Sequence, residues 1–91
     1  MSINLYSPVN GEVVVWHKKP GDFVKVDESI VDIECGEVVY EIPAPANGIL
    51  KEVILKTGAI VTANQVIGTF EVQHFRARLV AKLKNIMKRR S

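Results

Sequence analysis

An internal repeat limits the folds open to this 91-residue chain more than any other feature does. Residues 7–34 align with residues 44–71 at a constant offset of 37 and without a gap. Eight positions are identical and pair Pro8 with Pro45, Asn10 with Asn47, Gly11 with Gly48, Lys19 with Lys56, Gly21 with Gly58, Val24 with Val61, Ile30 with Ile67 and Glu34 with Glu71. Two copies are too few for a solenoid, which needs about three repeats to be stable. The repeat therefore predicts two similar halves packed about a pseudo-twofold axis.

Turns and β-branched segments follow each other in the same order in both halves. Each half reads as a Pro-x-Asn-Gly turn, a strand, a glycine turn, a short strand and a strand ending in Glu. We expect a left-handed backbone at Asn10-Gly11 and Asn47-Gly48, and again at Gly21 and Gly58, because glycine adopts positive φ without steric cost. The sequence thus predicts an all-β fold.

The strand that closes the first half alternates in polarity. Val31 and Ile33 are apolar, whereas Asp32 and Glu34 are acidic, and Ile30 falls in step with the two acids. Successive side chains of a strand point to opposite faces. We therefore expect Val31 and Ile33 to face the core, with the other three side chains on the opposite face. Two sheets that bury such inner faces against each other form a sandwich.

The middle of the chain reads as a β-hairpin. The segments 30–34 and 38–42 flank the tight turn Cys35-Gly36-Glu37, which lies at the centre of the repeat. We expect this turn to be an exposed hairpin tip at the end of the domain opposite the two chain termini.

Composition gives no sign of export, membrane insertion or metal binding. The chain has no apolar run of 18 residues, and its start, Met1-Ser2-Ile3-Asn4, does not resemble a secretory signal. Cys35 is the only cysteine, so neither an internal disulfide nor a cysteine-based zinc site is expected. His17 and His74 lie too far apart in sequence to indicate a metal site. These features predict an intracellular protein of the cytoplasm or the mitochondrial matrix.

Charge divides the chain into two parts. All ten Asp and Glu residues lie at or before Glu71, whereas seven of the twelve Lys and Arg residues follow it. Five cations against ten acids give the first part a net charge of −5, and the second part carries +7. We therefore divide the chain into a β domain, residues 1–72, and a basic tail, residues 73–91.

The basic tail has the spacing of an amphipathic helix. Phe75, Leu79, Leu83 and Ile86 recur at helical intervals, and neither Pro nor Gly interrupts the segment. The tail residues expected to contact a partner are Phe75, Arg76, Arg78, Leu79, Lys82, Leu83, Lys84, Ile86, Lys88, Arg89 and Arg90. Such a helix packs on its own domain, joins two chains in a homo-oligomer, or binds an anionic membrane or nucleic acid. These alternatives remain open at this point.

Four motifs in the β domain resemble a known family. They are Trp16-His17-Lys18-Lys19-Pro20-Gly21-Asp22, Val31-Asp32-Ile33-Glu34, Val38-Val39-Tyr40-Glu41-Ile42-Pro43-Ala44-Pro45 and Asn47-Gly48-Ile49-Leu50. They look like a domain of the lipoyl/biotinyl carrier family, and in particular like the lipoyl domain of the acyltransferase component of 2-oxoglutarate dehydrogenase. The resemblance runs from about Asn4 to Val72 without an insertion. It implies a flattened β-barrel of two four-stranded sheets, also described as a barrel-sandwich hybrid.

The hairpin tip departs from this family at its attachment residue. The resemblance implies an Asp-Lys pair at this tip, where the lysine amine forms an amide with lipoate, and Met-Lys-Met in biotinyl domains. This chain has Gly36 and Glu37 at the two positions and no lysine between Lys25 and Lys51. A carboxylate has no amine to acylate. We therefore expect a degenerate attachment hairpin, Cys35-Gly36-Glu37, without lipoate, biotin or another cofactor.

The chain has the motifs of this family but lacks the attachment lysine. This combination favours a function through protein contacts. We expect a non-lipoylated module, not an enzyme, that docks on a protein related to a dehydrogenase complex. The contact candidates on the β domain are Asp32, Glu34, Glu37 and Glu41. One alternative is an acyl carrier disabled by nature or by engineering, and another is an adaptor that binds an anionic membrane or nucleic acid through its tail. Chemistry at Cys35 is disfavoured, because the acidic neighbours Glu34 and Glu37 oppose a reactive thiolate.

Overall fold

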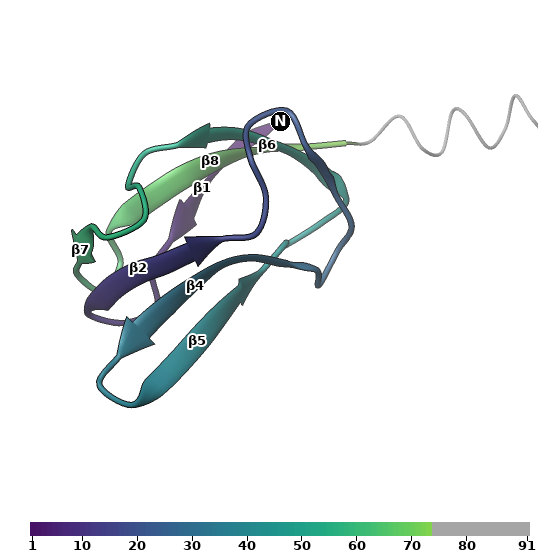
Figure 1. Cartoon of the computed structure of the whole chain (residues 1–91). Helices are drawn as coiled ribbons and strands as arrows, with labels where there is room; N and C mark the ends of the chain where they lie inside the picture. Colours follow the sequence, from purple (N-terminus) through teal and green to yellow (C-terminus); the bar gives the residue numbers. More distant parts are fainter. Residues whose placement is uncertain (74–91) are drawn as a thin grey trace, which may run out of the picture.

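The structure is a computed structural model that describes residues 1–73. Eight β-strands form two antiparallel four-stranded sheets in this part of the chain (Figure 1). The predicted tail helix lies outside the described residues, of which Gln73 is the last, and so do the contact candidates from Phe75 to Arg90.

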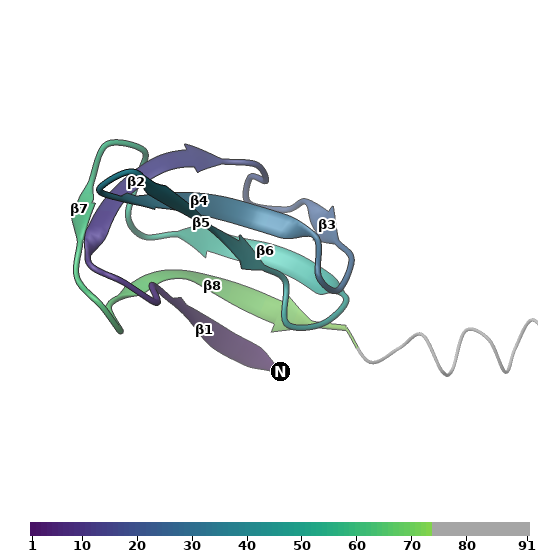
Figure 2. The ribbon, with the colours of Figure 1, turned by 90° about the horizontal axis from the view of Figure 1, so that it is seen from below.

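The two sheets have the same construction. In spatial order, the first contains β1 (Ser2–Tyr6), β8 (Val66–Val72), β6 (Gly48–Val53) and β3 (Phe23–Val24). The second contains β5 (Val38–Pro43), β4 (Ser29–Cys35), β2 (Gly11–Trp16) and β7 (Ile60–Val61). Figure 2 shows the sheets as stacked layers, as the alternating strands predicted.

The sequence repeat is reproduced in the backbone. β2 and β6, β3 and β7, and β4 and β8 each start 37 residues apart. The hydrogen bonds repeat as well, since Val13 donates its N–H to the Ala59 carbonyl at 2.9 Å and Leu50 donates to the Asp22 carbonyl at 3.1 Å. Each half thus supplies its short strand to the sheet of the other half. This exchange confirms the predicted pseudo-twofold arrangement.

The prediction of a left-handed backbone at Asn10-Gly11 and Asn47-Gly48 is wrong. Among residues 1–73, positive φ occurs at Gly21, Gly36 and Gly58, and at two non-glycine positions, Asp27 and Asn64. Gly21 and Gly58 therefore behave as predicted, with φ of 96° and 93°.

Gly11 and Gly48 are needed for a different reason, which is close approach of another strand. A Cβ at either position would lie 2.2 Å from a backbone carbonyl oxygen, that of Glu34 for Gly11 and that of Glu71 for Gly48. Their asparagine neighbours bind across the domain, because the side-chain oxygen of Asn10 accepts from the Ala63 N–H at 2.7 Å. The Pro-x-Asn-Gly segments therefore join the halves rather than simply turn the chain.

The core lies between the sheets. The buried apolar side chains are Leu5, Val13, Val24, Ile30, Val31, Ile33, Ile42, Ala44, Leu50, Val61, Ile67, Phe70 and Val72. Val31 and Ile33 face this core as predicted, but Ile30 is also fully buried and does not share the face of the acids. The register between β4 and β5 shifts between Ser29 and Val31, and such a shift breaks the simple alternation of side chains.

Candidate functional site

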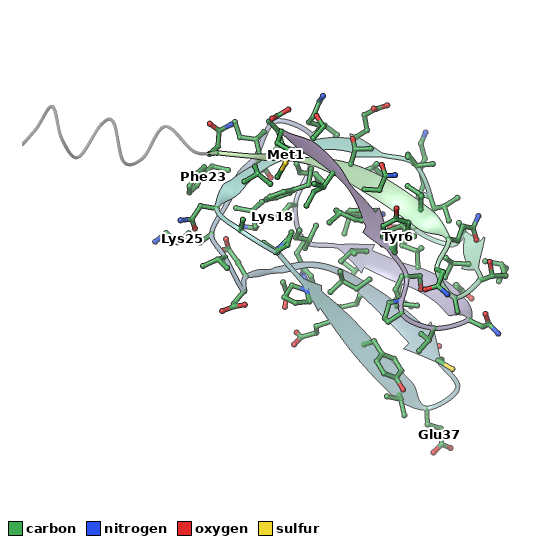
Figure 3. The ribbon with its side chains drawn as sticks, turned by 180° about the vertical axis from the view of Figure 1, so that it is seen from behind. Met1, Tyr6, Lys18, Phe23, Lys25 and Glu37 are labelled. Carbon is green, nitrogen blue, oxygen red and sulfur yellow. The ribbon has the colours of Figure 1, made fainter. Side chains whose placement is uncertain are left out.

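The hairpin formed by β4 and β5 extends beyond the body of the domain. Residues 34–41 are all exposed, although β4 is a central strand for the rest of its length. Figure 3 shows Glu37 at the far end of this hairpin, and Met1 at the opposite end of the domain. The sequence-based prediction of an exposed tip is confirmed, and within residues 1–73 Met1 lies at the opposite end of the domain (Figure 3).

A two-residue turn closes the hairpin. Cys35 pairs with Val38, so Gly36 and Glu37 are the two central residues of the turn. Gly36 has a φ of 62°, whereas Glu37 is not among the residues with positive φ. Positive φ at the first central residue alone is the pattern of a type II′ turn, which favours Gly at that position. Glycine thus fixes the shape of the tip and places the Glu37 carboxylate in solvent.

Met1 and the end of β8 occupy the position that corresponds to this tip in the other half. Val72 donates its N–H to the Met1 carbonyl at 2.9 Å, and the repeat equates these residues with Cys35 and Val38. The Met1 α-amine forms an ion pair with the Glu71 carboxylate, which also accepts a hydrogen bond from the Ser2 hydroxyl at 2.8 Å. The bond from the α-amine, followed by that from Ser2, holds the pKa of Glu71 below its ordinary value of 4.5.

The hairpin has one apolar and one acidic face. Because directly paired residues share a face of an antiparallel sheet, the pairs of Ile33 with Tyr40 and Cys35 with Val38 continue the core face outward. Val38 is 52% exposed and Tyr40 38% exposed. An apolar surface therefore extends along the hairpin past the edge of the core.

The opposite face of β2, β4 and β5 carries most of the predicted contact residues. We call this set the outer face and define it as Glu12, Val15, Asp32, Glu34, Val39 and Glu41. Two rows cross the three strands, because Glu12 pairs with Glu34 and Glu34 with Val39, while Val15 pairs with Asp32 and Asp32 with Glu41. The structure thus brings the predicted residues Asp32, Glu34 and Glu41 together and leaves Glu37 at the tip.

Glu12, Val15 and Val39 complete this surface, and sequence reasoning did not identify them. The register between β2 and β4 shifts between Val13 and Val15, and this irregularity turns Val15 outward beside Asp32. Glu12 could have been noticed as an acidic residue in a predicted strand. Its position opposite Glu34, however, depends on strand pairing that the repeat does not specify.

Like charges face each other on the outer face. Two carboxylates stand directly opposite in the pair Glu12 and Glu34 and in the pair Asp32 and Glu41. Asp32 has His17 beside it, with 3.0 Å between Nε2 and Oδ1, although the angle is not that of a hydrogen bond. Within residues 1–73, no Lys or Arg side chain forms an ion pair with any of these four acids. The face therefore has unbalanced negative charge.

A second surface feature is an open depression of about 470 Å³ beside the segments 16–22 and 53–57. Two of its three lysines have acidic partners, since Lys18 Nζ lies 3.0 Å from Glu28 and Lys19 Nζ lies 3.9 Å from Asp22. Hydrogen bonds from the Lys25 N–H and then from Lys18 lower the pKa of Glu28. These contacts stabilise the loops.

The described residues offer no metal centre. Within the range 1–73, no group of three or more His, Cys, Asp or Glu side chains has a geometry that would hold a metal ion.

The same part of the chain has no helix that is long and apolar enough to cross a membrane. Cys35 is a free, exposed thiol on the apolar face of the hairpin.

Comparison with protein families agrees with the fold. A family model for biotin and lipoyl domains, described as "Biotin-requiring enzyme", matches residues 3–70, which include the whole hairpin. The chain belongs to this family. The resemblance seen in the sequence motifs is confirmed.

Relatives in the family are much longer proteins. The dihydrolipoyllysine-residue succinyltransferase component of the 2-oxoglutarate dehydrogenase complex of Pseudomonas aeruginosa is 50% identical over 62 residues, covering 68% of this chain and 15% of that protein. The same component of Buchnera aphidicola subsp. Schizaphis graminum is 42% identical over 82 residues, covering 88% of this chain and 21% of that protein. This chain thus spans about a fifth or less of the length of these relatives.

Solved structures show the same architecture. The solution structure of the lipoyl domain of the 2-oxoglutarate dehydrogenase complex from Azotobacter vinelandii matches with a TM-score of 0.70 and 37% identity, over 79% of this chain and 99% of that domain. A single-chain, multi-domain long-chain acyl-CoA carboxylase matches in fold alone, with a TM-score of 0.76 and 19% identity, over 91% of this chain and 8% of that protein. The β domain is therefore a lipoyl domain of the 2-oxoglutarate dehydrogenase type, and lipoyl domains are carriers rather than catalysts.

The hairpin of this chain does not fit the attached group that the relatives' name specifies, which is a dihydrolipoyllysine residue. The tip offers the Glu37 carboxylate, and the segment 26–50 contains no lysine. Lys25 lies just after β3 and Lys51 lies within β6. Both of these strands belong to the sheet that does not contain the hairpin. No residue of the hairpin supplies an amine for an amide bond.

Proposed function

We propose that this chain is a lipoyl domain that carries no lipoate and docks on a protein partner through its hairpin. The observation that supports the proposal most strongly is an exposed hairpin with Gly36 and Glu37 at its tip and no lysine from residue 26 to residue 50. The chain itself has no catalytic role in this proposal. Its function depends on recognition of the hairpin surface.

The exposed side chains of the hairpin are suited to protein contacts. Val38 and Tyr40 are 52% and 38% exposed on the same face of the hairpin, and the acids Glu37 and Glu41 are next to them in the sequence. Contiguous exposed apolar side chains with a polar border are typical of interaction sites. The first partner to test is a protein of a 2-oxoacid dehydrogenase complex, because the relatives are named as components of such a complex.

Binding of the purified full chain to the dehydrogenase component of a 2-oxoglutarate dehydrogenase complex tests this function. We expect Glu34→Lys to weaken binding by roughly tenfold or more if the hairpin is the contact surface. Glu52→Lys is the matched control, because Glu52 is exposed on β6 in the other sheet. Equal binding by both variants would contradict the hairpin as the contact surface, and absence of binding by the unaltered chain would contradict this partner.

A carrier that has lost its attachment residue is the second candidate, favoured by the 50% identity to a protein named for a dihydrolipoyllysine residue. Replacing Gly36→Asp together with Glu37→Lys restores the residue pair that the family resemblance implies. Lipoylation of this double variant by lipoate ligase would support a carrier geometry that survives in the hairpin. A folded variant that stays unmodified with excess ligase and lipoate would argue against this candidate.

An adaptor function through the tail is the third candidate, and the charge of +7 after Glu71 is the observation that favours it. Binding of the full chain to vesicles of phosphatidylserine and phosphatidylcholine, and to duplex DNA, tests this function. Electrostatic binding weakens steeply as salt rises. Absence of binding at low salt would remove the candidate.

A further inference from the structure

Within residues 1–73, no other strand covers the outer face, which carries both apolar and acidic side chains. Val15 is 39% exposed and Val39 is 50% exposed, and each lies at the end of one row, on β2 and on β5, next to a pair of like charges. Directly opposed like charges destabilise a sheet. A partner with cationic and apolar side chains would cover the valines and neutralise the exposed carboxylates of Glu12, Glu34 and Glu41. Asp32 is only 16% exposed and lies beside His17.

The chain itself contains a segment with this chemistry. Residues 74–91 include seven Lys and Arg residues and no Asp or Glu. The apolar residues Phe75, Leu79, Leu83 and Ile86 lie among them. The β domain, with its net charge of −5, and this segment, with +7, are complementary in charge. Each chain supplies one outer face and one such segment.

The direction of β8 favours a second copy over the same chain. β4 runs toward the hairpin tip, whereas β8, its equivalent in the other sheet, runs toward the opposite end of the domain. The last described contact, from the Gln73 N–H to the Asn47 carbonyl at 3.0 Å, holds the chain at that end. To reach its own outer face, the segment 74–91 would have to reverse direction and pass around to the other sheet. A second copy needs no such reversal.

We propose that residues 74–91 of one chain bind the outer face of a second copy. The proposal rests on the proposed docking function and names a further partner for the same surface. The two contacting surfaces differ, so two chains either cover each other's outer face in a closed reciprocal pair or associate head to tail. The head-to-tail arrangement leaves one free surface at each end and extends to longer assemblies or a closed ring as the concentration rises.

Sedimentation equilibrium of the full chain at low salt tests the proposal. We expect a mass that increases with concentration and falls toward that of a monomer at high salt. Glu41→Lys should weaken the association by roughly tenfold or more. The substitution places a cation opposite Asp32, which favours the folded sheet. Glu52→Lys changes the charge equally on the other sheet and should leave the association unchanged.

A charge-swap experiment separates the second copy from the same chain. The tail variant Lys82→Glu with Lys84→Glu should be a monomer alone, and the Glu41→Lys variant should associate weakly. Mixing the two should restore a complex, because each supplies a surface that complements the other. Docking within one chain would give monomers in the mixture and would overturn the proposal.

The remaining outcomes keep the two proposals distinct. An unaltered chain that stays monomeric at its highest soluble concentration would overturn self-association. An association that survives Glu41→Lys would overturn the outer face as its contact surface. Binding of the dehydrogenase component that depends on Glu34, measured with a monomeric chain, would still support the docking function. Self-association without binding of that component would support the self-association proposal and contradict the dehydrogenase component as the docking partner.

Discussion

The backbone of Gly11 passes so close to Glu34 that a Cβ at position 11 would lie 2.2 Å from the Glu34 carbonyl oxygen. Gly48 stands in the same relation to Glu71. We expect Gly11→Ala and Gly48→Ala each to lower the free energy of unfolding by roughly 2 kcal/mol, because the strands must separate to admit the methyl group. Urea denaturation of both variants measures this loss.

Gly36→Asn is the control for these two variants. A Cβ at Gly36 would meet nothing within 4 Å, and its positive φ is one that asparagine tolerates. We expect a much smaller loss of stability for it. A large loss at Gly11 with none at Gly48 would contradict the equivalence of the two halves.

Removal of one carboxylate from the pair Glu12 and Glu34 should stabilise the isolated domain. The two side chains are directly opposite, and relief of such repulsion contributes about 0.5 kcal/mol. Glu34→Gln should therefore raise the urea midpoint. Glu52→Gln is a matched control, because Glu52 faces Thr69 rather than another acid. Destabilisation by Glu34→Gln would show that the outer face gains from its charge in the free domain.

Stability should fall in acid, in part because of Glu71. Its pKa is lowered in the folded state, first by the hydrogen bond from the Met1 α-amine. A lowered folded pKa stabilises the fold at pH values above the ordinary value of 4.5, and this contribution is lost as the pH falls through the folded pKa. Urea midpoints between about pH 6 and pH 3 should therefore depend less on pH in Glu71→Gln than in the unaltered chain. An unchanged pH dependence would contradict this role, and Glu52→Gln provides the control.

The chain ending at Gln73 should fold by itself. All eight described strands and the buried core lie within residues 1–73, and the last described hydrogen bond joins Gln73 to Asn47. We expect a cooperative urea transition and, since the segment 74–91 is gone, a monomer at every concentration. An unfolded chain would show that the tail belongs to the core.

The sequence predicted the relation between the halves better than it predicted individual faces. Identity at an offset of 37 residues was enough to indicate the paired sheets, and Gly36 was enough to place the turn. The faces of Ile30 and Val15 depend on register shifts within β4 and β2, and these arise from pairing between strands rather than from local pattern. The close approach at Gly11 likewise depends on Glu34, which is 23 residues away in the chain.

The absence of an attached lipoyl or biotinyl group is the central claim, and the intact mass of the chain tests it most directly. The protein should be purified from cells with active lipoate and biotin ligases, with the Gly36→Asp and Glu37→Lys double variant as the matched control. We predict the unmodified mass for the unaltered chain. A mass increment equal to a lipoyl or biotinyl group, located by peptide mapping to residues 34–38, would contradict the account.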